Sequence, residues 1–464
     1  MAASFLAGLA TADGAMRAGL ASRVITPLEP MWAAGYASRN QPVAETEHDL
    51  WAKALALEDE QGCQIVLVTT DLLGFPRELA DRVARAVEDR YGVRREALLL
   101  SSSHTHSGPV LRNSLVDIYP MGPEEAAKVA AYTSWLEPQL VELVGEALAR
   151  REPAELAHGV GRAGFAMNRR QRMEQGTAIG VNPQGPVDHD VPLLRISAPG
   201  GQLRAIFFSY ACHCTTLDSY RWCGDYAGFA QIELEAAHPG ALALFAAGCG
   251  ADANPHPRRS MEICREHGHA LAQAVEAALA GPLRPVSGPL AAAWREIDLA
   301  FAGVPSRAEL EAQIAGGNQW EQSRARRYLA LLDRGEAIPA KYAFPIQTLR
   351  LGDDLTLVAL AGEVVAEYSL SLKRELAPDR TWVIGYANDV FAYIPTETIL
   401  AEGGYEGDSS MAVYGLPARW AAGLERQIVD AASDLARRTA APRAPAPAGA
   451  RLLSRAAPAG DGAP

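Results

Sequence analysis

The chain has 464 residues, of which 48% are hydrophobic and 21% are charged, as in an ordinary soluble globular protein. Its 55 acidic and 43 basic side chains give a formal net charge of −12. The sequence contains no run of Lys or Arg that would form a surface for a polyanion, which argues against nucleic acid as a partner. No window reaches the roughly 18 to 20 uninterrupted apolar residues of a membrane span. The N-terminus makes a poor signal peptide and the six cysteines are few for this length, so we expect a cytoplasmic protein with reduced thiols.

Apolar runs and amphipathic segments alternate from about residue 22 to residue 437, which predicts an α/β fold. The expected strands are Gln64–Thr69, Ala97–Leu100, Ala205–Tyr210, Leu242–Ala246, Leu355–Leu360 and Trp382–Gly385. The expected helices are Pro76–Tyr91, Glu124–Arg151 with an interruption near Pro138, Gln231–Ala237, Met261–Leu279, and a polar surface insertion from Ser306 towards Asp333 with a break at Gly316-Gly317. This order predicts a mixed, mostly parallel central sheet with helices on both faces and an active site at the carboxyl edge of the strands.

Composition divides the chain into three parts. Residues 1–21 form an N-terminal extension, and residues 22–438 form one large domain in which we find no internal repeat. Residues 439–464 contain mainly Ala, Pro, Arg and Gly without periodicity. Such a segment buries too little apolar surface to order itself, so we expect a disordered tail.

Polar residues follow each predicted strand at the point where it ends. His104 and His106 stand two residues apart directly after the strand that ends at Leu100. The corresponding residues after other strands are Asp71, His213, Asp252 with Asn254, Glu363, and Asn388 with Tyr393. Singly, Asp71 could cap a helix, His213 could be a core histidine and Glu363 could begin a helix. Their recurrence at one edge of a parallel sheet instead favours a functional site.

Two of these histidines and one carboxylate match the usual ligands of a catalytic zinc ion. His104, His213 and Glu363 supply this set, with a position left for water. Zinc lowers the pKa of its bound water towards about 7 and polarises a carbonyl, so amide or ester hydrolysis becomes possible at neutral pH. His106 would then be free to hydrogen-bond the carbonyl oxygen or the leaving group. Cys212 and Cys214 flank His213 and offer a less favoured alternative, a zinc site with cysteine ligands.

The motifs resemble the neutral, non-lysosomal ceramidase family, whose members are zinc amidases that cleave N-acyl sphingosines. The resemblance spans about Gly19 to Pro417. It rests on Ile25-Thr26-Pro27, Ser103-His104-Thr105-His106-Ser107-Gly108-Pro109, Asn168-Arg169, Ala211-Cys212-His213, Gly250-Ala251-Asp252, Ala361-Gly362-Glu363, Asn388-Asp389-Val390-Phe391-Ala392-Tyr393, Tyr405-Glu406-Gly407 and Tyr414-Gly415.

The resemblance implies a fuller set of site residues than the spacing of the motifs does. It implies zinc ligands at His104, His213, Glu363 and the phenol of Tyr393, the last of which the spacing argument does not find. It also implies that His106 and Arg169 hold the carbonyl region of the substrate. A fixed cation beside a developing oxyanion stabilises the transition state more than the ground state. Without that role, Arg169 would form only a surface salt bridge of little energetic value.

The sequence departs from the family at its serine nucleophile. That position falls on Asn254 or on Ala253, depending on how the segments are matched, and neither side chain can act as a nucleophile. We therefore expect direct attack by zinc-activated water, with Asn254 orienting the substrate or lining the pocket. We also expect no counterpart to the family's carboxy-terminal immunoglobulin-like domain, and we expect a natural substrate other than ceramide.

Taken together, the sequence predicts a zinc-dependent amidohydrolase that acts on a small-molecule acyl substrate, a linear amide of the N-acyl amine type. Asp71 or Asp252 would handle protons or orient a ligand. An ester or lactone hydrolase would use the same metal and oxyanion groups. Two other hypotheses are a zinc-binding homologue without catalysis and a protein without metal, whose histidines form a hydrogen-bonded core. Acyl chain length, amine identity and oligomeric state are open.

Overall fold

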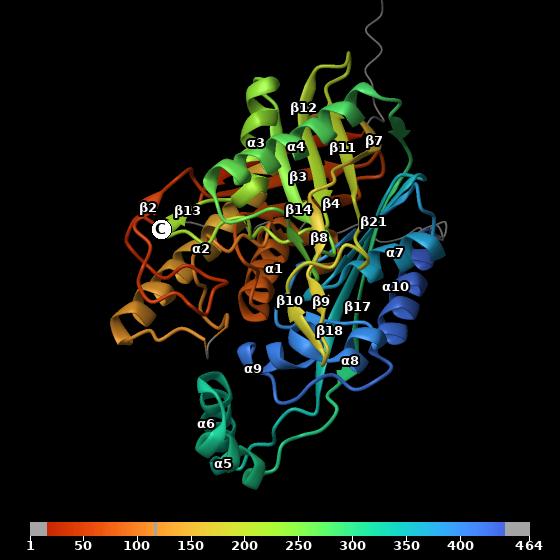
Figure 1. Cartoon of the computed structure of the whole chain (residues 1–464). Helices are drawn as coiled ribbons and strands as arrows, with labels where there is room; N and C mark the ends of the chain where they lie inside the picture. The colour runs from red at the N-terminus through yellow and green to blue at the C-terminus, as the bar shows by residue number, and fades with distance from the viewer. Residues whose placement is uncertain (1–15, 116–117, 441–464) are drawn as a thin grey trace, which may run out of the picture.

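The computed structural model describes residues 16–115 and 118–440 and shows a mixed α/β fold (Figure 1). The three largest sheets within these ranges each combine antiparallel strands with one parallel pair at an edge. The expectation of one mostly parallel central sheet is therefore wrong. Several long strands that the sequence analysis did not identify supply the antiparallel neighbours.

The first sheet has the strand order β5-β4-β3-β1-β6, and only β4 and β5 are parallel. Its strands are β1 (Arg17–Val24), β3 (Trp51–Glu58), β4 (Gln64–Thr70), β5 (Leu98–Ser102) and β6 (Glu152–Pro153). Helices α1 (Arg77–Tyr91) and α2 (Pro123–Ala149) cover its outer face. Strand β1 starts inside the expected extension 1–21, and α2 continues through Pro138 without the expected interruption.

The second sheet has the strand order β14-β12-β11-β7-β16, and only β12 and β14 are parallel. Its strands are β7 (Glu155–Arg162), β11 (Asp190–Ser197), β12 (Leu203–Tyr210), β14 (Leu242–Ala247) and β16 (Arg284–Val286). Helices α3 (Asp225–Ala237) and α4 (Met261–Ala280) pack on its outer face. Helix α3 begins before the expected Gln231, while α4 matches the expected helix closely.

The third sheet has the order β17-β18-β19-β21, with β19 and β21 parallel. Its strands are β17 (Leu290–Ala300), β18 (Lys341–Leu351), β19 (Leu355–Leu360) and β21 (Thr381–Ile384). Helices α7 (Ala366–Glu375) and α10 (Leu424–Ala440) cover it. Helices α5 (Arg307–Gly316) and α6 (Gln319–Asp333) form the expected insertion, each starts at a capping box, and they project from the main body (Figure 1).

Short elements connect these layers. They are β2 (Glu45–Thr46), η1 (Arg95–Ala97), β8 (Ala166–Asn168), β9 (Arg170–Arg172), β10 (Thr177–Ile179), β13 (Arg221–Trp222), β15 (Ala253–Pro255), β20 (Glu363–Val364), β22 (Tyr393–Ile394), α8 (Glu397–Glu402), the π-helix η2 (Tyr405–Ser409) and α9 (Ser410–Val413). No helix of the described ranges is long and apolar enough to cross a membrane. Of the expected extension and tail, residues 1–15 and 441–464 lie outside these ranges.

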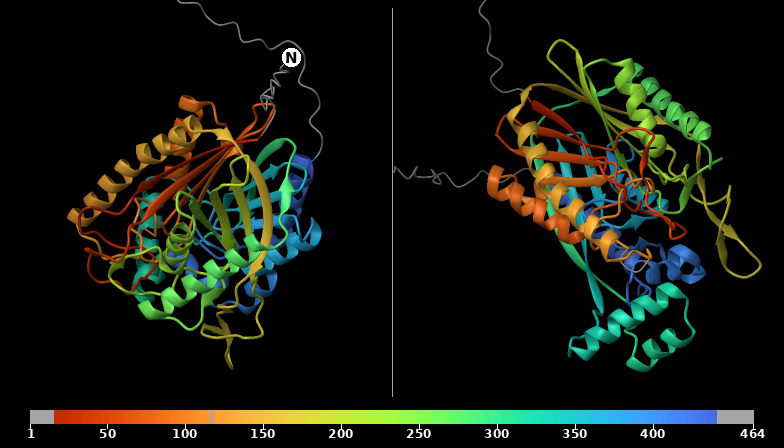
Figure 2. Two further views of the ribbon diagram at one scale, coloured as in Figure 1. Left: turned by 90° about the horizontal axis from the view of Figure 1, so that it is seen from above. Right: turned by 90° about the vertical axis from the view of Figure 1, so that its left-hand side faces the viewer.

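The inner faces of the three sheets pack against one another in one shared core. Leu67 of β4, Phe207 of β12 and Leu357 of β19 belong to it and are fully buried. Alternate residues such as Val66 and Val68 face outward and pack beneath the helices. Figure 2 shows the orange, green and blue helices on three sides of these strands. Because the strands are buried on both faces, their sequences read as continuous apolar runs.

The edges that carry the parallel pairs meet in the middle of the molecule. An isolated bridge joins Ser101 of β5 to Ala387, just after β21, and another joins Gly248, just after β14, to Ile384. The loops that follow the carboxyl ends of β5, β14 and β21 are thereby brought together, although these strands belong to three sheets. This convergence positions the residues of the candidate site.

Candidate metal centre

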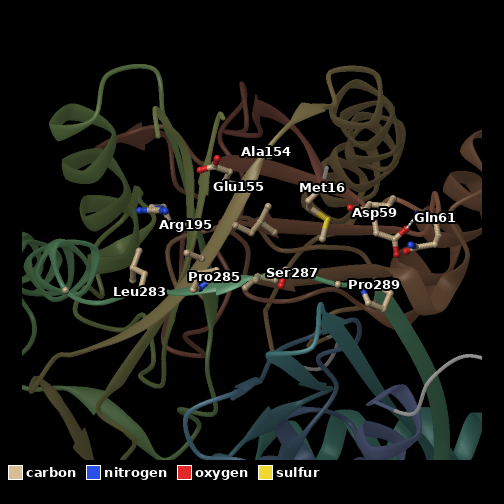
Figure 3. A pocket seen from close by; sticks show the side chains of 16 residues that line it. Met16, Asp59, Gln61, Ala154, Glu155, Arg195, Leu283, Pro285, Ser287 and Pro289 are labelled. Atoms are coloured by element: carbon tan, nitrogen blue, oxygen red, sulfur yellow. Dashed lines mark hydrogen bonds between the residues drawn. The ribbon is translucent and has the colours of Figure 1, made fainter. Parts of the chain in front are cut away.

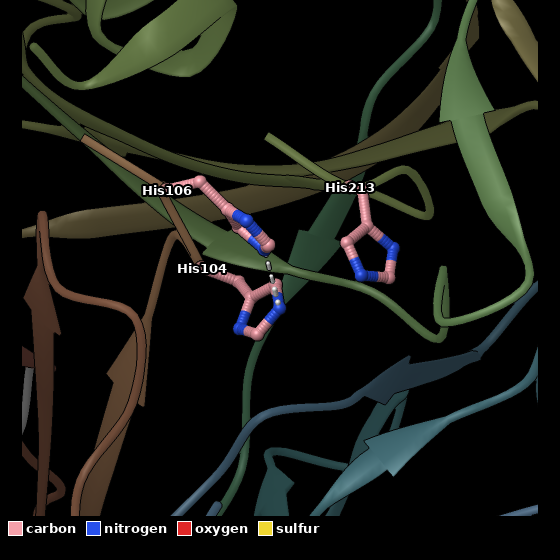
Figure 4. A group of neighbouring side chains, drawn as sticks. All are labelled: His104, His106 and His213. Atoms are coloured by element: carbon pink, nitrogen blue, oxygen red, sulfur yellow. Dashed lines mark hydrogen bonds between the residues drawn. The ribbon is translucent and has the colours of Figure 1, made fainter. Parts of the chain in front are cut away.

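The two histidine-bearing loops run side by side at the centre of the fold. Thr105 and Cys214 form a parallel bridge, and the backbone N–H of His106 donates to the Cys214 carbonyl at 3.2 Å. His104 adopts a φ of 58°, in the left-handed region that residues other than glycine rarely occupy. This backbone turn follows directly after β5, and it places His104, His106 and His213 around one point (Figure 4). Backbone strain of this kind is typical of functional sites.

The three imidazoles are close enough to bind one metal ion. Each offers a ring nitrogen, and these nitrogens lie within 4.8 Å of one another. His104 and His213 are 1% and 0% exposed, whereas His106 is partly exposed. Nε2 of His106 lies 3.3 Å from Nε2 of His104. The site is therefore buried and approached on the side of His106.

A second pair of short strands adds a carboxylate and a phenol to the cluster. Strands β20 and β22 are parallel, and Glu363 pairs in register with Tyr393. Glu363 Oε2 lies 3.2 Å from Nε2 of His104 and 3.1 Å from Nε2 of His213. The Tyr393 hydroxyl lies 3.4 Å from the same His213 nitrogen. The Tyr414 hydroxyl donates to the other oxygen of Glu363, Oε1, which leaves Oε2 directed at the histidines.

The hydrogen bonds around these groups show that they fit a cation. Nδ1 of His104 lies 2.6 Å from the Leu73 carbonyl, and Nδ1 of His213 lies 2.8 Å from the Gly250 carbonyl. A carbonyl only accepts, so each Nδ1 carries the proton and each Nε2 presents a lone pair. Two lone pairs and the Glu363 carboxylate then face one another without a proton between them. A zinc ion, which prefers such nitrogen and oxygen donors, would relieve this repulsion.

His106 lies between this cluster and a wall formed by an N-terminal loop. Its Nδ1 is buried and has no hydrogen-bond partner in the described ranges. Burial keeps the pKa of His106 well below its ordinary value, so the ring is neutral at pH 7. Tyr36 packs on it with ring centroids 4.7 Å apart. A neutral imidazole offers one donor and one acceptor; Nδ1 lies against Gly35, and Nε2 faces the cluster.

Arg169 belongs to a buried network of charges rather than to the surface. Its Nη2 donates to the Tyr393 hydroxyl at 2.9 Å, and its Nε donates to Glu406 Oε1 at 2.8 Å. Glu406 Oε2 accepts from Nη1 of Arg170 at 2.7 Å, so this carboxylate lies between two guanidinium groups. All three side chains are at most 5% exposed. The alternative of a surface salt bridge for Arg169 is therefore wrong.

Asn254 is the family's nucleophile position in one matching of the segments, and it contacts Arg169. Its Oδ1 accepts from Arg169 Nη1 at 3.3 Å and from the Thr215 hydroxyl at 3.2 Å. The same Arg169 nitrogen lies 3.3 Å from Nε2 of His213. Ala253, the other matching position, is buried with only a methyl side chain. Neither residue carries a nucleophilic oxygen or sulfur atom.

The two aspartates of the sequence analysis lie in different surroundings. Asp252 accepts from the side-chain amide of Asn168 at 2.9 Å and from the Ala366 backbone N–H at 2.8 Å. Burial raises its pKa to about 6, and these contacts link the segments that carry Arg169 and Glu363. Asp71 accepts from the Trp51 backbone N–H at 2.9 Å and lies against strand β3. It does not cap α1, whose N-cap residue is Pro76.

Sequence reasoning gave no role to two residues that hold the site together. Glu406 and Tyr414 occur in the motifs that carry the family resemblance, but the motif alone does not show that they bind Arg169 and Glu363. Gly35, which packs against the ring of His106, gave no sequence signal at all.

A cavity of about 550 Å³ lies away from the histidine cluster, and residues such as Asp59, Glu155 and Arg195 line it (Figure 3).

Comparison with known proteins agrees with the sequence motifs. Residues 19–254 match the family described as neutral/alkaline non-lysosomal ceramidase, N-terminal. No curated protein matches the chain. The fold is similar to a structure described as ceramidase complexed with C2, with a TM-score of 0.71 and 18% identity over 91% of this chain and 75% of that one. It is also similar to neutral ceramidase from Pseudomonas aeruginosa, with a TM-score of 0.69 and 20% identity over 93% of this chain and 76% of that one. The chain belongs to the neutral/alkaline non-lysosomal ceramidase family.

Proposed function

We propose that this protein is a zinc-dependent hydrolase that cleaves a linear amide of the N-acyl amine type. The observation that carries the proposal is the buried convergence of the two Nε2 atoms of His104 and His213 on Oε2 of Glu363. When bound there, Zn²⁺ supplies a nucleophile at neutral pH and polarises the carbonyl of the scissile bond. Membership in a ceramidase family supports amide hydrolysis as the reaction.

We assign the metal ligands as His104, His213, Glu363 and Tyr393 rather than as the three imidazoles. The backbone carbonyls that accept from Nδ1 of His104 and His213 fix the tautomer and the ring orientation, as is typical of zinc-binding histidines. His106 has no such partner in the described part of the chain. It is therefore better suited to bind the substrate than to bind the metal.

His106 and Arg169 would act on the substrate carbonyl and on the leaving amine. The neutral His106 ring can donate to an oxygen or accept from an amine N–H, depending on its tautomer. The contacts of Arg169 Nη1 are both 3.3 Å long, and they are the weakest that this guanidinium makes. This nitrogen can therefore turn towards a developing oxyanion while Glu406 and Tyr393 hold the remainder of the group.

The other predicted residues have supporting roles in this proposal. Asn254 holds Arg169 and lines a cavity beside the site, together with Pro255 and Arg258. The attack on the carbonyl uses no side-chain nucleophile. Asp252 orients the segments of Arg169 and Glu363, since both of its oxygens already accept from N–H groups. We assign no chemical step to Asp71, which accepts a hydrogen bond from the backbone of Trp51 in β3.

Matched substrates and metal removal test the proposed function. N-ethyloctanamide and ethyl octanoate share an acyl chain and differ only at the scissile atom. We expect the zinc-loaded protein to hydrolyse the amide, to lose this activity after chelation and to regain it when zinc is restored. Hydrolysis of the ester alone would favour the esterase hypothesis, and bound zinc without turnover of either compound would favour the non-catalytic one. Ceramide hydrolysis as fast as that of the best N-acyl amine would contradict our expectation of a different natural substrate.

Gly35 provides a test of the role of His106. It has a φ of +97°, and a Cβ built on it would lie 2.4 Å from ring atoms of His106. We expect Gly35→Ala to push the ring aside and to lower kcat by about 10²-fold without loss of zinc, as small misplacements of a reacting group do. Gly62→Ala is the matched control, because Gly62 has a φ of +78° but open space around its Cβ position. Equal rates in the two variants would show that the position of His106 is unimportant.

A further inference from the structure

A cavity of about 350 Å³ adjoins the candidate active site on the side of Asn254. It lies among β8, β10 and β15; β8 pairs with β15, and Figure 1 shows β8 near β10. Ile179, Val181 and Pro255 contribute apolar surface to its lining. Arg258 is the one Lys or Arg among the described residues that line it. The cavity therefore combines apolar side chains, the polar groups of Asn254 and His256, and a single fixed positive charge.

Within the described part of the chain, Arg258 has no ion-pair partner although it is partly buried. Its Nη1 donates to the Thr215 hydroxyl at 3.4 Å, and it forms no ion pair with any carboxylate of residues 16–115 and 118–440. Burial is the largest cause that lowers its pKa; the charges of Arg259 and Arg169 act in the same direction, and Tyr36 and Asp218 oppose them. By contrast, Arg259 is exposed and pairs with Asp218. A partly desolvated guanidinium without an anion is costly, so Arg258 is suited to receive an anion from outside the chain.

A short chain of contacts connects this guanidinium to the reacting groups. The Thr215 hydroxyl that accepts from Arg258 donates in turn to Asn254 Oδ1 at 3.2 Å. The same Asn254 oxygen accepts from Arg169, whose Nη1 lies 3.3 Å from Nε2 of His213. Asn254 thus belongs both to the wall of the cavity and to the surroundings of the metal cluster. A substrate whose amide lies at the metal could extend its amine portion past Asn254 into the cavity.

We infer that the amine portion of the substrate carries a carboxylate that Arg258 binds, which makes the substrate class N-acyl amino acids. This inference rests on the proposed amide hydrolysis. A carboxylate matches the fork of one guanidinium and its single charge, whereas a phosphate dianion would leave one charge without a partner in the lining. The apolar surface of Ile179, Val181 and Pro255 suits a hydrophobic amino-acid side chain. Ceramide carries no such charge, so Arg258 would select against it.

Binding of two ketones that cannot be hydrolysed tests the inference without any need for turnover. The probes are 4-oxoundecanoate and 4-oxoundecanamide, which replace the scissile N–H of N-octanoylglycine and of its amide by CH₂. We expect calorimetry on the zinc-loaded protein to show about 10- to 100-fold tighter binding of the acid, as a charge-assisted hydrogen bond provides. Arg258→Gln should remove this preference. Arg259→Gln, at the exposed neighbour, should retain it.

The binding measurements decide whether Arg258 binds a substrate carboxylate. Equal affinity for the two ketones, binding of neither, or an acid preference that survives in Arg258→Gln would overturn the assignment of Arg258. A preference that Arg258→Gln abolishes and Arg259→Gln retains would support it. Hydrolysis of N-octanoylglycine is measured separately. If the acid binds selectively but N-octanoylglycine is not cleaved, the proposed hydrolase function fails while the carboxylate subsite stands.

Discussion

Replacing His213 by Ala is expected to remove zinc from the protein and to abolish amide hydrolysis. The substitution deletes one of the two buried imidazoles whose Nε2 atoms face Glu363 Oε2, and it leaves that carboxylate without its partner at 3.1 Å. Without the metal, the pKa of the attacking water returns from about 7 to about 15.7, so the rate should fall by several powers of ten. Elemental mass spectrometry of dialysed protein should give about one zinc per chain for the wild type and none for the variant.

His238→Ala is the matched control for this experiment. His238 is partly exposed and pairs with Glu276 at 2.8 Å, and this pair includes no residue of the metal cluster. It should therefore keep the zinc and the activity of the wild type. If His213→Ala still binds one zinc per chain, the ligand assignment is incorrect. If the wild type binds no zinc even when it is supplied, the histidines form a hydrogen-bonded core and the hydrolase proposal loses its basis.

Replacing Glu406 by Gln is expected to produce the largest loss of stability among the site variants. The carboxylate accepts from Arg169 Nε at 2.8 Å and from Arg170 Nη1 at 2.7 Å, with all three side chains buried. Gln removes the negative charge, leaves the buried Arg169 without a carboxylate and leaves Arg170 with Glu402 alone. Removing one partner of a buried pair typically costs about 3 to 5 kcal/mol of unfolding free energy. Urea unfolding of the zinc-loaded proteins, followed by circular dichroism, measures this difference.

Glu402→Gln distinguishes a buried charge network from a general effect of removing a carboxylate. Glu402 also pairs with Arg170, at 3.0 Å, but its side chain is 30% exposed. Its replacement should cost about 1 kcal/mol, less than that of Glu406, because water partly solvates the Glu402 carboxylate. Similar losses in both variants would mean that Glu406 is not the central charge of the network. Because Glu406 also holds Arg169, its variant should lose activity even under conditions where it remains folded.

The sequence by itself determined the local features of the fold and the identity of the central histidines. Apolar runs located β4, β12, β14 and β19, the capping box at Ser306 located the start of α5, and Gly316-Gly317 located the break before α6. These signals depend on residues a few positions apart, so a linear pattern contains them. The two histidines after β5 were found for the same reason.

Only the tertiary structure decided how the strands pair. An apolar run such as that of β19 is equally compatible with parallel and antiparallel neighbours. Its composition depends on the burial of both faces and not on the direction of the neighbouring strands. In the fold, β19 is antiparallel to β18 and parallel to β21. The expected single parallel sheet therefore became three mixed sheets whose parallel edges converge.

The partners of the site residues were also decided by the tertiary structure. Glu406 binds Arg169 across 237 positions of sequence, and Glu363 meets His213 across 150. The family motifs contain these residues, yet a motif does not show which of them touch. The carbonyls that orient His104 and His213 are backbone groups, which every residue possesses and no sequence pattern marks. The sequence therefore specified which chemical groups are present, and the packing of three sheets decided which of them share one buried site.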